Sequence, residues 1–112
     1  MKKITKLAII AAFALAAGFE AFFNNVPVTV EAVSPRSLYM QNCATCHGSN
    51  GKALTKRGLK LGATDLTSAD VQSMERTKII RAINNGRPGM PGFKKKLTAR
   101  QIAQIADYVH AF

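Results

Sequence analysis

Two cysteines and a histidine stand together in the segment Cys43-Ala44-Thr45-Cys46-His47, and they constrain this chain more than any other feature. In the spacing Cys-x-x-Cys-His, the two thiols can reach the two vinyl groups of one haem, and the histidine can bind its iron. A chain of 112 residues buries only a marginal core, so a large apolar group bonded to it would also reinforce the fold. The motif predicts one haem c, bonded covalently through Cys43 and Cys46, with His47 as an iron ligand.

Three other interpretations of this motif find less support in the rest of the sequence. A thioredoxin-like dithiol would need a strand-helix-strand pattern, which is missing, and a structural disulfide would close a very short loop. A zinc site lacks the paired histidine spacing of zinc fingers. Its ligands would have to be Cys43, Cys46, His47 and His110.

The N-terminus has the pattern of an export signal. Lys2, Lys3 and Lys6 make its start positive, and residues 7–18 form an unbroken apolar run. This run is too short to cross a bilayer, which takes about 20 residues. Small residues at Val30 and Ala32 suit a signal peptidase. The sequence predicts a signal peptide over 1–32, with retention as a membrane anchor as the alternative, and a periplasmic domain over 33–112.

The predicted mature domain is strongly basic. The whole chain has a formal net charge of +10, and removing the three lysines and two glutamates of residues 1–32 leaves about +9. Such a charge draws a protein to acidic surfaces at rates that fall with salt. Nucleic-acid binding is the alternative, but the basic residues are scattered, no binding motif accompanies them and the chain carries an export signal. We expect acidic proteins as partners and no nucleic acid.

The spacing of apolar residues after Ser34 favours helices over alternating strands, so the mature domain is predicted to be all-α. Ser34 and Pro35 are typical of a helix start, and this helix is expected to run through Cys43 towards Gly48. Residues 48–67 show no sustained period and predict a long loop, which could wrap one edge of a cofactor.

Two more helices are expected in the second half of the chain. Ser73 or Thr77 is predicted to cap the first, which ends at Gly86 as a candidate left-handed cap. Thr98 and Gln101 predict a capping box at the start of the second. The buried face of the first is expected to contain Ile79, Ile80 and Ile83. The buried face of the second is expected to contain Ile102, Ile105, Ala106 and Val109.

Three segments carry a resemblance to a known family, namely CATCHG at 43–48, GMPGF at 89–93 and IADYVHAF at 105–112. With them, the chain after the export segment resembles the small class I cytochromes c, of the cytochrome c6-like and cbb3-associated kinds. The resemblance implies three main helices packed around one covalent haem. It also implies that Met90 is the second iron ligand. Residues with an implied packing role are Tyr39, Phe93 and Tyr108.

The residues themselves also favour Met90. A Gly- and Pro-rich turn can hold its thioether rigidly against the haem face opposite His47, although methionine is by itself more often a packing residue. Met40 lies on the same expected helix as His47 and is poorly placed to reach that face, and Met74 is a weak rival. His110 is expected to be a polar residue at a frayed C-terminus.

Iron bound by both His47 and Met90 has no open position for substrate or oxygen. We therefore expect a monomeric electron carrier of a respiratory chain and not an enzyme. Its partners would be a quinol-oxidising complex, a dehydrogenase or a terminal oxidase. A five-coordinate haem enzyme such as a peroxidase, or a gas-binding haem protein, is the alternative if Met90 is not a ligand. The run Lys94-Lys95-Lys96 is either a solvated surface or a docking ring for the acidic partner.

Overall fold

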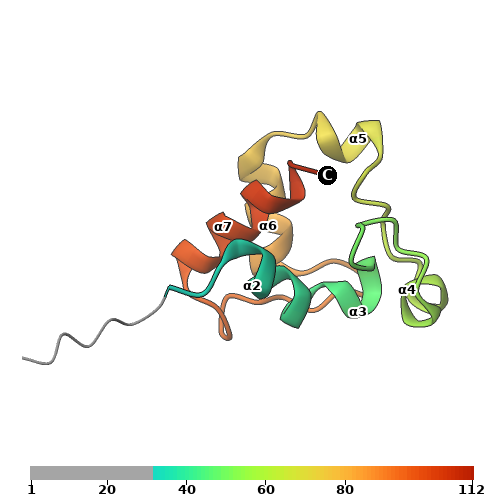
Figure 1. Ribbon diagram of the computed structural model, residues 1–112, viewed down its shortest axis with the longest axis horizontal. Coiled ribbons are helices and arrows are strands. Elements are labelled where there is room, and N and C mark those ends of the chain that lie inside the picture. The colour runs from blue at the N-terminus through green and yellow to red at the C-terminus, as the bar shows by residue number, and fades with distance from the viewer. Residues whose placement is uncertain (1–31) are drawn as a thin grey trace, which may run out of the picture. The chain divides into compact units, whose positions relative to one another are not determined.

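The computed structural model describes residues 32–112, and the regular structure of this part of the chain is helical (Figure 1). Within this range the only β-type pairing is an isolated bridge between Arg87 and Met90, so the predicted all-α class is confirmed. No helix in the described part of the chain is long and apolar enough to cross a membrane. The predicted signal peptide, and its alternative as an anchor, lie outside the described residues except for Ala32.

The first helix, α2 (Pro35–Asn42), starts as predicted, because the Ser34 side chain accepts a hydrogen bond from the Ser37 amide at 3.1 Å. The regular helix is interrupted at Cys43, whose φ of −119° is far from the usual helical value although its ψ of −37° is not. A separate turn, α3 (Ala44–His47), follows. The prediction of one continuous helix is therefore wrong. The turn α3 packs against the next helix, and no local sequence signal marks the break.

A short helix, α4 (Lys56–Leu61), interrupts the segment predicted to be a long loop. The Thr55 hydroxyl accepts a hydrogen bond from the Gly58 amide at 2.9 Å, and Gly62 ends the helix in the left-handed conformation. The helix has no apolar stripe to reveal it, since Leu59 remains 66% exposed. The prediction of an unbroken loop over 48–67 is wrong for this reason.

The predicted caps of the next helix are also wrong. Ser68 instead caps a single turn, α5 (Ala69–Gln72), which Ser73 ends. The longer helix α6 (Arg76–Asn85) follows Glu75, which makes no side-chain cap. It buries Ile79 and Ile83 as predicted, whereas Ile80 is half-buried. Gly86 ends it with a positive φ of 75° but with ψ 179°, which is outside the left-handed helical region.

The core lies where the last helix, α7 (Ala99–Val109), packs against α2 and α6 (Figure 1). The predicted capping box of Thr98 and Gln101 is present, and the predicted apolar face is buried. Tyr39 of α2 is fully buried, with its ring centroid 5.1 Å from that of Tyr108 on α7. This packing fixes α2, and with it the segment that carries the Cys-x-x-Cys-His motif. Buried side chains of α7 are Ile102, Ile105, Ala106 and Val109.

Candidate haem site

The motif lies at the junction of α2 and α3. Cys43 and Cys46 are half-buried free thiols, while His47 is only 8% exposed. Burial raises the pKa of the Cys43 thiol to about 11, with the neighbouring Cys46 adding to this rise and Lys96 opposing it. The Cys43 thiol is therefore partly shielded from water, which suits attachment to an apolar cofactor.

Thr55 and Gly58 hold the motif from the side of α4. The Thr55 hydroxyl is 2.8 Å from the Thr45 carbonyl and 3.0 Å from the Cys46 carbonyl, both of which can accept its hydrogen bond. Gly58 approaches so closely that a Cβ there would overlap the Cys46 carbonyl and lie 2.8 Å from that of Ala53. The short helix α4, which no apolar stripe indicates in the sequence, thus anchors the attachment segment.

His47 is oriented by a backbone group. Its Nδ1 lies 2.9 Å from the Thr64 carbonyl oxygen. Because a carbonyl only accepts, Nδ1 must carry the hydrogen, which leaves the lone pair of Nε2 available for a metal. The sequence gives no side-chain signal for this acceptor, and sequence reasoning missed it. Asp65 and Thr67 do form a local turn beside it, with Asp65 Oδ1 accepting from the Thr67 amide at 2.8 Å.

Met90 lies in a tight turn after α6. The amide of Arg87 donates to the Met90 carbonyl at 3.0 Å, and the Met90 amide donates to the Arg87 carbonyl at 2.8 Å. Pro88 occupies the second position and Gly89, with φ 80°, the third, as in a type II turn. The backbone of Met90 is therefore fixed at both of its polar groups.

This turn packs directly onto the end of α6. A Cβ on Gly86 would overlap the Met90 carbonyl, and a Cβ on Gly92 would lie 2.7 Å from the Asn84 carbonyl. The Phe93 amide donates to the Ile83 carbonyl at 2.8 Å, which closes the segment after the turn. Only glycine allows such close approach at both positions.

One cavity of about 480 Å³ brings the four predicted site residues together, and its volume is typical of a cofactor pocket. Cys43, Cys46 and His47 reach it from α2 and α3, and Met90 reaches it from the turn after α6. A smaller inner cavity of about 80 Å³ shares part of this lining. The shared residues are Cys43, His47, Thr64, Arg87 and Met90.

The mouth of the main cavity is positively charged. Arg57, Arg87 and Lys96 line it, and no carboxylate does. These cations suit the two acidic propionates of a haem. Phe93, implied by the resemblance to pack in the pocket, is buried and lines the same cavity. The free thiols, the oriented imidazole, the thioether and the cationic mouth together fit a covalent haem.

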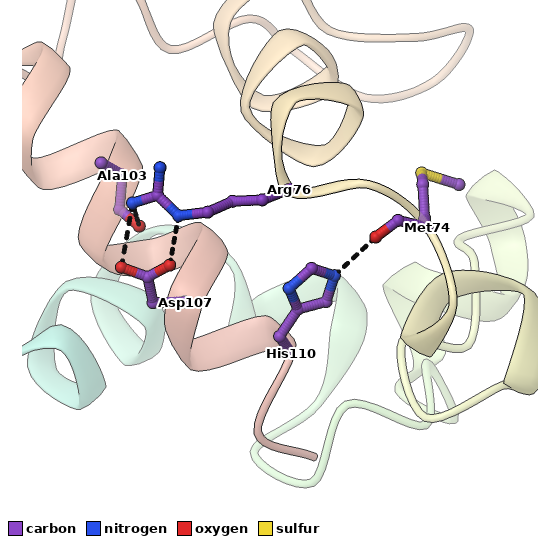
Figure 2. Close-up of polar contacts among 5 residues, drawn as sticks. All are labelled: Met74, Arg76, Ala103, Asp107 and His110. Atoms are coloured by element: carbon purple, nitrogen blue, oxygen red, sulfur yellow. Dashed lines mark hydrogen bonds and ion pairs between the residues drawn. The ribbon is translucent and has the colours of Figure 1, made fainter.

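The structure also places the residues of the other assignments, namely the zinc site, the other methionines and His110. Within residues 32–112 no three His, Cys, Asp or Glu side chains lie together in a way that could hold a metal, so the zinc alternative gains no support. Met40 does not line the main cavity, whereas Met74 lines the inner one. His110 is not a frayed polar residue, because its Nε2 lies 2.8 Å from the Met74 carbonyl (Figure 2). That expectation is corrected.

The fold and the cavity define a small class I c-type cytochrome, in which a haem is held by a Cys-x-x-Cys-His segment. Residues 30–109 match the family described as cytochrome c oxidase, cbb3-type, subunit III, and the chain belongs to this family. Its cofactor is accordingly covalent haem c, as predicted.

Relatives with known names agree with this class. The chain is 34% identical to cytochrome c6 of Nostoc sp. over 109 residues, which covers 97% of this chain and 92% of that protein. It is 34% identical to the CcoP subunit of the cbb3-type cytochrome c oxidase of Azospirillum brasilense over 77 residues, covering 67% of this chain. This match spans only 26% of the subunit, about a quarter of its length.

Among solved structures, the c-type cytochrome KustC0563 is similar, with a TM-score of 0.66 and 36% identity over 71% of this chain and 98% of that one. The predicted function of a monohaem electron-transfer cytochrome is confirmed by these relatives. The alternative of a haem enzyme finds no support among them.

Proposed function

We propose that Cys43 and Cys46 would form the two thioether bonds to the haem, that His47 and Met90 would hold its iron, and that the protein carries single electrons between periplasmic or membrane redox partners. The observation that supports this best is the single cavity lined by all four residues. When bound, the haem supplies a one-electron redox couple. Iron held by both an imidazole and a thioether would have no position open to substrate, so this proposal describes a carrier and not an enzyme.

The residues of the chain have separate tasks in this proposal. Thr64 holds the His47 imidazole in one tautomer, so that Nε2 stays directed at the cofactor. The Arg87–Met90 turn keeps the thioether from moving when the charge of the site changes. Phe93 helps to exclude water from the cavity. A site that is rigid in this way changes oxidation state with little reorganisation.

The ligand assignment is tested on the exported protein with its haem. The ferric wild-type protein is expected to show a low-spin spectrum with the far-red sulfur-to-iron band, and Met90→Leu is expected to abolish that band. Met40→Leu is the matched control, since Met40 does not line the main cavity, and it should retain the band. Loss of the band in Met74→Leu but not in Met90→Leu would assign the thioether to Met74 instead.

The partner that we propose is an acidic redox protein, either in the periplasm or facing it from the membrane, approached by a monomer of this chain. Arg57, Arg87 and Lys96 surround the cavity mouth, and Lys94 and Lys95 are exposed beside it. Steering this cationic face towards an acidic partner would shorten the electron path. The cbb3 oxidase subunits among the relatives support a terminal oxidase as one such partner.

A further inference from the structure

The segment between Leu66 and Arg76 is tied to the last helix by side-chain hydrogen bonds. Gln72 Nε2 donates to the Leu66 carbonyl at 2.7 Å and to the Val109 carbonyl at 2.8 Å. Arg76 pairs with Asp107 of α7 through two bonds, of 2.5 Å and 3.0 Å (Figure 2). Polar ties therefore join a segment of little regular structure to the rigid core.

This segment forms part of the wall of the proposed haem pocket. Leu66, Val71 and Met74 line the inner cavity, which His47 and Met90 also line. Apolar packing contributes to holding this segment, since Val71 is buried in the core and Leu66 and Met74 pack against it. The polar ties to α7 add to this packing.

Met74 lies in this wall between two cavities. It lines the inner cavity and also a groove of about 380 Å³ on the outer side of α6. The groove is open to water, since its lining includes the exposed cations Lys78, Arg81 and Arg87. Met74 is thus part of the partition between solvent and the cavity that holds the iron ligands.

His110 holds Met74 from α7. Its Nε2 lies 2.8 Å from the Met74 carbonyl, and because the carbonyl only accepts, Nε2 is the donor (Figure 2). The Met74 amide also donates to the Val71 carbonyl at 3.1 Å, whereas Glu75 begins α6 without a side-chain cap. His110 itself is well anchored, since its amide donates to the Ala106 carbonyl at 3.1 Å.

We propose that His110 is a positioning residue for the haem pocket, acting through Met74 to keep the wall between the inner cavity and the outer groove closed to water. The inference rests on the proposed function, because it assumes that the inner cavity adjoins the iron. Water that enters this cavity would stabilise the oxidised iron, which carries the extra positive charge, and would lower the reduction potential.

The test compares three variants of the haem-loaded protein. His110→Leu keeps side-chain bulk but removes the donor, and it is expected to lower the reduction potential and to speed hydrogen exchange at the amides of Met74 and Glu75. His110→Gln restores a donor at a similar reach and is expected to recover most of the wild-type potential. Asp107→Asn is the matched control, since it weakens the neighbouring tie to Arg76 without touching Met74.

The control Asp107→Asn should lower the thermal midpoint of unfolding, as His110→Leu does. It should leave the reduction potential at the wild-type value. An unchanged potential in His110→Leu, or an equal fall in Asp107→Asn, would overturn the positioning role. The far-red band of the wild-type protein reports the ligands alone, whereas only the difference between variants reports the role of His110. Failure of the ligand assignment and failure of this inference are therefore distinguishable.

Discussion

The Nδ1 atom of His47 donates a hydrogen bond to the backbone carbonyl of Thr64 at 2.9 Å, across 17 positions of the sequence. A carbonyl partner increases the basicity of a ligating imidazole, which favours the oxidised metal. The turn that follows Thr64 is fixed by Asp65, whose pKa is lowered by the hydrogen bonds that it accepts from Thr67. The electronic character of the histidine is thus set by a loop distant in sequence.

Replacing Asp65 with alanine is expected to raise the reduction potential slightly. The change removes both hydrogen bonds from Thr67 and loosens the backbone that presents the Thr64 carbonyl to His47. A weaker bond to Nδ1 makes the imidazole a poorer donor to oxidised iron. Redox titration measures the shift, and Asp70→Ala, at an exposed position in α5, should leave the potential where it was. Equal potentials in the two variants would contradict the prediction.

Gly58→Ala is expected to destabilise the haem-loaded protein by about 1–3 kcal/mol. The new Cβ would overlap the Cys46 carbonyl, which is backbone and cannot move aside without shifting the attachment segment. Chemical denaturation followed by the haem absorbance measures the loss. Leu59→Ala on the same helix is the control, because this side chain is 66% exposed, and its effect should be within about 0.5 kcal/mol. A stability loss in Gly58→Ala no larger than the control would argue against a tight α3–α4 contact.

Tyr39→Phe is expected to cost about 1–3 kcal/mol at neutral pH, because the Tyr39 hydroxyl donates to the buried Gly48 carbonyl at 2.7 Å. Burial, with smaller contributions from Cys43 and Tyr108, raises the pKa of Tyr39 well above its usual 10. The unfolded chain therefore ionises first, and stability is lost as the pH rises above 10.

Removing the phenol should remove this part of the alkaline loss, so the stability curve of Tyr39→Phe is expected to be flatter above pH 10. Tyr108→Phe is the control from the same aromatic cluster, since Tyr108 is only half-buried. Unfolding measured from pH 7 to 11 checks both variants. Parallel curves for Tyr39→Phe and the wild-type protein would show that this group does not cause the pH dependence.

Changing Lys94, Lys95 and Lys96 together to glutamine is expected to slow electron exchange with an acidic partner by roughly tenfold at low salt, and to flatten its salt dependence. The matched control removes the same charge at exposed positions that do not line the main cavity. It consists of Arg36→Gln, Lys78→Gln and Arg100→Gln. Stopped-flow measurements over a range of ionic strength compare the rates of electron exchange of the two triple variants. If electron exchange is slowed equally in both variants, the net charge of the protein and not a docking face controls the rate.

Local signals in the sequence predicted the helix starts at Ser34 and Thr98, because each cap is made by residues within three positions. The caps of α4 and α5 are equally local, since Thr55 accepts from the Gly58 amide and Ser68 from the Val71 amide, but no long apolar stripe follows them to indicate a helix. The break at Cys43 has no local signal. A cap therefore predicts a helix more reliably where an apolar stripe follows it.

The residues and contacts of the candidate site were likewise predicted from the sequence only in part. The Cys-x-x-Cys-His motif is contiguous, and the family resemblance implied Met90, so these four residues of the main cavity were predicted from the sequence. The Thr64 carbonyl was not, because any residue type can supply a backbone acceptor. The tie of His110 to Met74 was missed because its partner is also a carbonyl, and a histidine near the end of the chain gave no reason to expect one.

The close packing of the Met90 turn against the end of α6 limits how Met90 can leave in a ligand exchange. Gly86 and Gly92 seat the turn against the helix, and the Phe93 amide is bonded to the Ile83 carbonyl. For Met90 to swing away, these contacts must break together with the last turn of α6, so its departure is a cooperative local unfolding event. We expect a thioether that leaves rarely and in one step, at a frequency governed by how often the end of this helix frays.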